Sequence, residues 1–238
     1  KCRMISLQKS DLRPQKAVMG QILRIGLPVL AQDGLVQIGF LIITIIANQR
    51  GLTDAAAVGI VEKFISFVFL VPSSLLSTVS ALAAQNLGAD KPERARQTLW
   101  DSIALAFGFG VVVAIAIQFC VSGVVGLFTP DAATIAAGAN YLHGYIFDCM
   151  FAGIHFCFSG YFCACGKSGL SFLHSILAIV LIRVPGAYLM SRLFPQTLLP
   201  MGLATAAGSL FSAILCTLLY LGLTRRDVRR NSLHSVFG

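Results

Sequence analysis

The chain has 238 residues, of which 56% are hydrophobic and only 12% are charged, and its formal net charge is +8. Because soluble domains carry about a quarter charged residues, this composition and a mean hydropathy of +0.80 exclude an ordinary soluble domain and indicate a chain embedded in lipid. No nucleic-acid partner is expected despite the positive charge, since the basic residues flank long apolar segments.

Six apolar segments are long enough to cross a hydrocarbon core of about 30 Å, and they lack the period-two alternation of an outer-membrane barrel. Lipid offers no hydrogen-bond partners to the backbone, so each segment is predicted to be a helix. The expected fold class is therefore all-α, an integral membrane bundle of six transmembrane helices. In chain order the predicted spans cover residues 22–48, 55–84, 99–128, 132–165, 170–193 and 199–223.

Lysine and arginine gather in segments that the six spans place on one side of the membrane. Six lie in the first 24 residues, three after the second span, one at Lys167 and four in the C-terminal tail, whereas only Arg50 and Arg192 lie in the opposite loops. The positive-inside rule then predicts a multi-pass protein of the cell membrane with both termini in the cytoplasm. We divide the chain into a cytoplasmic linker (1–20), a six-helix transmembrane lobe (21–224) and a basic cytoplasmic tail (225–238).

The loop between the second and third spans reads SALAAQNLGADKPERARQTL over residues 80–99. Asn86 and Gly88 are predicted to supply the left-handed backbone geometry that ends a helix. Asp90 and Glu93 have the spacing of a capping box, with Pro92 in the first turn of the new helix. Within the second span, Pro72 predicts a bend.

Three of the predicted spans carry a stripe of polar side chains on one helical face, and each stripe contains one acid. The stripes are Asp33, Gln37, Thr44 and Asn48; Glu62, Ser66, Ser73, Ser77 and Ser80; and Tyr141, Tyr145, Asp148, His155 and Ser159. A carboxylate at the membrane centre costs at least about 2.5 kcal/mol and is tolerated mainly where it faces a bundle interior or water. The stripes therefore predict the wall of a pathway through the bilayer.

We expect Asp33, Glu62 and Asp148 to couple transport to a proton or a cation. The candidates for a substrate cavity are Gln37, Ser66, Tyr145, His155, Lys63 and Arg183. Glu62 and Lys63 point about 100° apart on a helix and cannot pair on one face. In the alternative interpretation Lys63 and Arg183 neutralise two acids as buried structural pairs, the serines bond to their own backbone, and His155 is a satisfied core histidine.

No enzyme activity is expected, because the chain lacks a Walker A loop and the GxGxxG, HExxH and GxSxG patterns. Seven cysteines are present, and the one-residue spacing of Cys163 and Cys165 fits no zinc motif, so they are interpreted as small packing residues. We therefore expect no metal site and no cofactor, with Na⁺ or H⁺ serving only as the coupling ion.

Several motifs resemble those of the multidrug and toxic compound extrusion (MATE) transporters: LRIGLP, AAQNLGADKPERAR, TPDA, SGYFCACGKS and IRVPGAYLMS. The resemblance implies one six-helix lobe, similar to the C-terminal half, of a transporter that exchanges amphipathic, often cationic, compounds for Na⁺ or H⁺. It implies small-molecule drugs, membrane lipid and an N-terminal six-helix lobe or a second copy as partners. Two alternatives stay open: a lipid-linked oligosaccharide flippase-like transporter, which needs a cationic cavity, and a non-transporting truncated membrane fragment with its acids paired in a closed bundle.

Overall fold

The computed structural model describes residues 15–237, and all its regular elements in that range are helical. The predicted linker residues 1–14 and the side chains of the predicted tail beyond Arg225 lie outside the described residues. The elements are α1 (Lys16–Asn48), α2 (Leu52–Val68), α3 (Leu70–Gly88), α4 (Pro92–Gly126), α5 (Ala132–Tyr145), α6 (Asp148–Ala164), α7 (Ser168–Ala178), the π-helix η2 (Ile179–Arg183), α8 (Val184–Leu193) and α9 (Leu199–Phe237).

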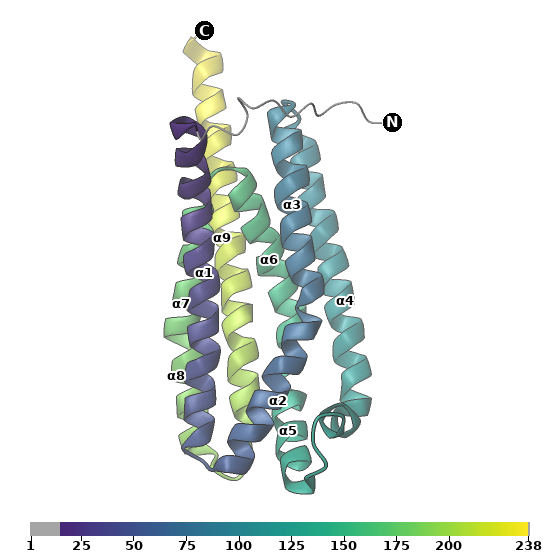
Figure 1. Cartoon of the computed structure of the whole chain (residues 1–238). Coiled ribbons are helices and arrows are strands. Elements are labelled where there is room, and N and C mark those ends of the chain that lie inside the picture. The colour runs from purple at the N-terminus through teal and green to yellow at the C-terminus, as the bar shows by residue number, and fades with distance from the viewer. Residues whose placement is uncertain (1–14, 238) are drawn as a thin grey trace.

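These helices make six spans, which confirms the predicted fold class. Five stretches are long and apolar enough to cross a membrane, and the bent pair α5–α6 makes the sixth. The helices run side by side along one axis, and the start of α1, the end of α9 and the α3–α4 hinge lie at the same end of the bundle (Figure 1). An even number of spans returns the chain to the side from which it started, so this arrangement follows from the span count.

The helical ends differ from the predicted boundaries of the lobe. α1 begins at Lys16, inside the segment assigned to the linker, and the backbone bond from Met19 N–H to the Gln15 carbonyl extends its hydrogen-bond ladder. At the other end α9 continues to Phe237, so the basic tail extends the last span as a helix. Both predicted boundaries lie where the apolar pattern stops, whereas a helix continues wherever its backbone hydrogen bonds continue.

The hinge between α3 and α4 corrects the predicted local geometry. Asp90, with φ 57°, holds the left-handed conformation, and Gly88 is still part of α3. Lys91 is the residue before α4, and it makes no side-chain capping bond, so the predicted capping box between Asp90 and Glu93 is wrong. Aspartate tolerates the left-handed conformation, and Asp90 in that conformation closes the turn instead of capping the next helix. Pro92 begins α4 as expected.

Three of the six spans are interrupted inside the membrane. α2 ends at Val68, four residues before Pro72, whose ring nitrogen cannot bond to the Val68 carbonyl, and this confirms the predicted bend. η2 precedes Pro185 in the fifth span, where the same lack of an N–H interrupts the helical ladder. α5 and α6 meet at an angle of 47°. These interruptions place polar backbone and side chains in the interior of the bundle, where protein surrounds them.

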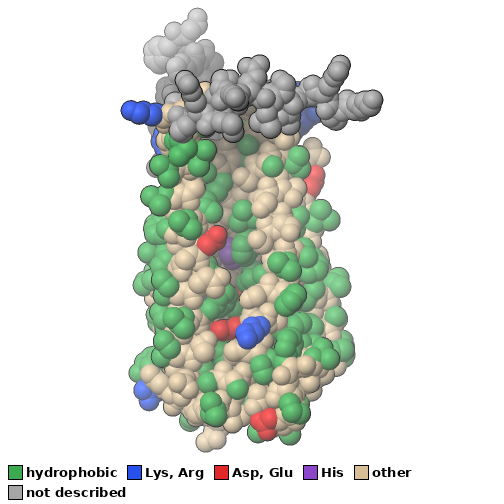
Figure 2. Space-filling view, in the orientation of Figure 1, with side chains coloured by type: hydrophobic (Ala, Val, Ile, Leu, Met, Phe, Trp, Pro, Cys, Tyr) green, Lys and Arg blue, Asp and Glu red, His purple; other side chains and the backbone are tan. Residues whose placement is uncertain are grey.

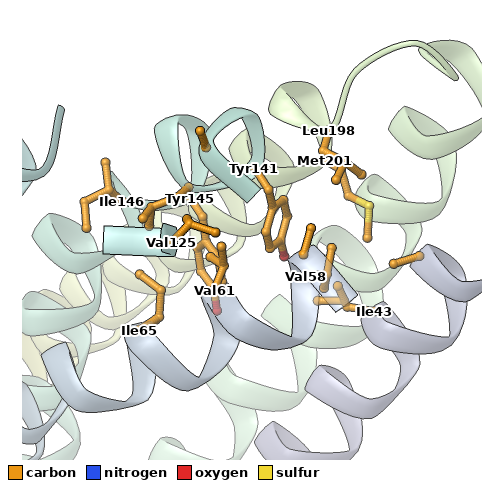
Figure 3. Close-up of a cluster of buried hydrophobic side chains, with 14 of the residues drawn as sticks. Ile43, Val58, Val61, Ile65, Val125, Tyr141, Tyr145, Ile146, Leu198 and Met201 are labelled. Atoms are coloured by element: carbon orange, nitrogen blue, oxygen red, sulfur yellow. The ribbon is translucent and has the colours of Figure 1, made fainter. Parts of the chain in front are cut away.

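The half of the bundle away from the chain ends has a core of buried side chains from α1, α2, α4, α5, α6 and α9. Figure 3 shows Tyr141 and Tyr145 packed among Ile43, Val58, Val61, Ile65 and Met201. The approach of α5 to α9 depends on two glycines: a Cβ on Gly202 would meet the Tyr141 carbonyl, and one on Gly144 would lie 2.5 Å from the Leu199 carbonyl oxygen. This close backbone packing, typical of membrane helices, positions Tyr145 in the interior.

The loop end of the bundle is closed by Arg50. Its guanidinium pairs with Asp54 at 2.7 Å and donates to backbone carbonyls of Ser191, Phe194, Pro195 and Thr197. All five guanidinium N–H groups can be used in this way, so Arg50 ties the α1–α2 turn to the α8–α9 loop.

Replacing Gly202 by valine should destabilise the bundle, because the added carbons meet the α5 backbone, which has no room to shift. Overpacking of this kind costs about 1–3 kcal/mol, and we expect a lower midpoint of thermal unfolding in detergent. Gly108→Val is the matched control, since a Cβ there meets nothing within 4 Å. Equal unfolding midpoints for the two variants would show that the α5–α9 approach tolerates a side chain.

Candidate functional site

A groove of about 320 Å³ opens on one face of the bundle, at the break between α2 and α3. On this face, acidic, basic and histidine side chains lie along a central strip between hydrophobic flanks (Figure 2). The walls of the groove come from α1, the α2–α3 break, α6 and α7. They are formed by Gln32, Asp33, Val36, Gln37, Phe40, Ser66, Phe69, Leu70, Ser73, His155, Phe156 and Ser175.

Four predicted site residues meet in this groove: Asp33, Gln37, Ser66 and His155. The Asp33 carboxylate is exposed there and has no hydrogen bond or ion pair with any described residue. Three aromatic rings line the same groove, those of Phe40, Phe69 and Phe156. An unpaired carboxylate among aromatic rings suits a ligand that is both positively charged and apolar.

A second group of predicted residues lies deeper in the bundle, around Arg183. The Arg183 Nη2 donates to the Tyr145 hydroxyl at 2.6 Å and to Asp148 Oδ2 at 3.4 Å. Its guanidinium carbon lies 5.0 Å from the centroid of the Phe40 ring and 5.6 Å from that of Tyr145. The pair is enclosed, because Asp148 is fully buried and Arg183 is 8% exposed. We call Glu62, Tyr145, Asp148 and Arg183 the buried cluster.

We include Glu62 in this cluster because its carboxylate turns inward from α2, where its Oε2 accepts a hydrogen bond from Thr44 at 2.9 Å. Three polar atoms of the cluster have no hydrogen-bond partner among the described residues: Glu62 Oε1, Asp148 Oδ1 and Arg183 Nε. The cluster therefore contains two carboxylates and one guanidinium, and only Asp148 is paired with that guanidinium. Such an imbalance in a low dielectric favours the uptake of one proton or one cation.

The three acids thus do not line one cavity. Asp33 faces the groove, whereas Asp148 is absent from its walls and is instead paired with Arg183, as in the alternative interpretation of the sequence. Lys63 pairs with neither acid: it is exposed on α2 and forms no hydrogen bond or salt bridge with a described residue. The divergence of Glu62 and Lys63 to different faces is as predicted.

The serine stripe has a mixed outcome. Ser66 and Ser73 line the groove, but the Ser66 hydroxyl also donates to the Glu62 backbone carbonyl at 2.8 Å. Ser77 bonds in the same way to the Ser73 carbonyl. The Ser66 and Ser77 hydroxyls therefore donate to backbone carbonyls of their own helical segments.

Sequence reasoning missed His174, which is fully buried beside His155 with 5.6 Å between the ring centroids. Its Nε2 lies 2.8 Å from the Ser159 hydroxyl and its Nδ1 lies 2.6 Å from the Ser212 hydroxyl. The sequence could have indicated His174, because it is a polar residue within a largely apolar span, as His155 is.

Comparisons with known proteins agree on one family. A family model described as MatE matches residues 28–189, more than half of the chain. A probable multidrug resistance protein NorM from Xanthomonas axonopodis pv. citri is 28% identical over 133 residues, covering 54% of this chain and 28% of that protein. A multidrug export protein MepA from Staphylococcus aureus is 26% identical over 195 residues, covering 82% of this chain and 43% of that protein.

The fold agrees as well. A crystal structure of MATE in complex with MaL6 superposes with a TM-score of 0.85 at 17% identity, covering 95% of this chain and 51% of that one. The chain therefore spans less than half the length of these curated relatives and about half the length of this solved structure.

Removing the Arg183 charge alone should destabilise the bundle more than removing the Arg183 and Asp148 charges together. Arg183→Met leaves the buried Asp148 carboxylate without its partner, and breaking a buried pair costs about 3–5 kcal/mol. The double variant Arg183→Met with Asp148→Asn should regain part of that loss. Thermal unfolding in detergent measures both, and a single variant as stable as the native protein would contradict an electrostatic role of the pair.

Proposed function

Because this chain belongs to the MatE family, we propose that it forms one lobe of an ion-coupled antiporter that exports amphipathic or cationic drugs across the cell membrane. MATE proteins are transporters and not enzymes, and the related NorM and MepA proteins are described as multidrug resistance and multidrug export proteins. The observation that carries the proposal is the groove, where the unpaired Asp33 carboxylate stands among aromatic rings.

The groove is the proposed drug site. An organic cation would place its charge against Asp33 and its apolar body against Phe40, Phe69 and Phe156, while Gln37 and Ser66 offer adaptable polar contacts. These contacts would select a ligand for its positive charge and its apolar body and not for a rigid set of hydrogen bonds. The site would therefore accept many amphipathic cations.

The buried cluster is the proposed coupling site. Asp148 pairs with the single guanidinium of Arg183, whereas Glu62 has no ion pair with a described residue, and a proton or Na⁺ would neutralise the remaining negative charge. Uptake and release of that ion would change the interactions of α2, α6 and η2, whose spans are all interrupted and can therefore shift against one another. Alternating access would follow from this movement.

A second lobe would complete the transporter. The groove is walled on one side by this chain, and the chain covers about half of the solved MATE structure that it superposes on. An N-terminal six-helix lobe or a second copy would close the open side. With Lys91, Arg94 and Arg96 at the hinge on the same end as the start of α1 and the end of α9, that end would face the cytoplasm.

The flippase-like alternative fits the groove less well. A lipid-linked pyrophosphate needs cationic walls, yet no lysine or arginine lines the groove among the described residues. The closed, non-transporting fragment also fits less well, because it requires paired acids and no cavity, whereas Asp33 is unpaired beside a groove of about 320 Å³.

Replacing Asp33 by asparagine in the complete transporter that contains this chain should abolish resistance to cationic drugs, because the amide keeps the shape but loses the charge. Accumulation of a fluorescent organic cation in whole cells measures export, and an immunoblot of the membranes checks expression. Asp101→Asn, an exposed carboxylate of α4 outside the groove, is the matched control. Undiminished export by the Asp33 variant would refute the proposed drug site.

Glu62→Gln and Asp148→Asn should uncouple transport from its ion gradient. Each amide removes the negative charge that attracts the ion, so an imposed H⁺ or Na⁺ gradient should no longer drive drug accumulation in proteoliposomes. Binding of the drug to the groove should persist, as measured by fluorescence polarisation. Gradient-driven accumulation retained by both variants would show that the coupling ion binds elsewhere.

A further inference from the structure

A small recess of about 30 Å³ adjoins the groove at His155. His155 and Ser175 belong to the walls of both spaces, and the recess also touches Arg183, Ser209 and Ser212. A cavity needs a volume of at least about 10–15 Å³ to hold one water molecule, so the recess has room for about one or two water molecules.

The lining of the recess suits water. His155 Nδ1 and Arg183 Nε are both enclosed and have no hydrogen-bond partner among the described residues. The hydroxyls of Ser175, Ser209 and Ser212 stand on the same walls. A water here would find the two or more polar partners that buried waters require, and it would relieve the cost of two buried unsatisfied groups.

The recess also connects the two parts of the site. His155 stands on the wall of the drug groove, while Arg183 donates to Asp148 in the buried cluster. Ser209, on the recess wall, lies beside the Asp148 carboxyl group. Asp148 itself does not line the recess, so Ser209 and Arg183 are the recess residues that connect it to the groove.

Few charged groups face His155. His174 from α7 lies with its ring centroid 5.6 Å away, Arg183 from η2 shares the recess, and Asp33 from α1 shares the groove. Among the described residues of those two spaces, α3 contributes only Ser73 as a polar side chain, and α9 only Ser209 and Ser212. Both ring nitrogens of His174 are engaged by serine hydroxyls, so His174 positions the neighbouring ring and is not itself free to pass a proton.

We propose that the recess is a water-filled proton path, in which His155 carries protons between the drug groove and the Asp148 carboxylate. This inference rests on the proposed function and adds the route and the identity of the coupling ion. His155 accepts a proton from water in the groove on one ring nitrogen and releases a proton from the other to the recess water. That water passes a proton through the Ser209 hydroxyl to Asp148, which becomes a neutral acid, and the reverse sequence returns the proton.

Neutral Asp148 no longer pairs with Arg183, so the guanidinium would turn to Glu62 and to the Tyr145 hydroxyl. One proton enters the path and one leaves it at each step, and no other reactant is consumed. Drug binding at Asp33 would be linked to this exchange because the drug and the proton both enter through the groove.

The test uses the complete transporter in proteoliposomes loaded with a pH-sensitive dye, with an organic cation added outside. His155→Asn keeps a hydrogen-bonding group near the Nδ1 position but cannot carry the proton, so drug-driven proton movement should slow at least roughly tenfold and lose its pH profile. Ser209→Val places methyl groups in the recess and should slow it similarly. His143→Asn, a histidine on α5 outside the groove and the recess, should behave as the native protein.

Four outcomes decide the matter. Slowed proton movement and a flat pH profile in the His155 and Ser209 variants support the path, and the Ser209 variant decides alone if the His155 variant does not fold. Native rates of proton movement and a native pH profile in those variants overturn the proton path, but they do not contradict the proposed drug export. Export driven only by Na⁺, with no proton movement, also overturns the proton path but not the proposed drug export. A native protein that exports no cation under either gradient overturns the proposed function as well.

Discussion

The burial of the Arg183 guanidinium in the membrane interior is the constraint on which the rest of the structure depends. A cation in a low dielectric is tolerated only when opposite charge and hydrogen-bond acceptors surround it. Asp148 and Tyr145 supply these from the bend between α5 and α6, and Glu62 supplies a second negative charge from α2. The interrupted spans thus meet at one charge, and the close α5–α9 contact at Gly202 and Gly144 holds Tyr145 against it.

The site divides into two environments with different physics. The groove is open and partly lined by aromatic rings, and its Asp33 carboxylate is exposed, so that carboxylate can exchange partners at low cost. In the buried cluster Asp148 and Arg183 are enclosed by protein, so breaking their pair costs about 3–5 kcal/mol. In the proposed function, this separation would let one lobe bind varied drugs in the groove and a single kind of ion in the buried cluster, with the recess beside His155 between them.

Membership of the MatE family and the length of the chain give this lobe its context. It covers about half of a solved MATE structure, with a TM-score of 0.85. Its groove is open to the surroundings on one face of the bundle. The opposite end is held differently: Arg50 ties two loops together through backbone carbonyls, so the lobe is firm at its loop end and interrupted in the middle. Movement about the interruptions is then easier than movement of the loops.

The sequence by itself determined the fold class, the six spans, the bend at Pro72 and the separation of Glu62 from Lys63. These follow from local rules: apolar length sets a span, proline removes a donor, and the helical period sets the direction of each side chain. The tertiary structure alone decided that Asp148 pairs with Arg183, 35 residues away, that Asp33 stays unpaired, and that His174 lies against His155. Helical periodicity gives a polar face but not its neighbour, because that neighbour is chosen by packing between spans far apart in the chain.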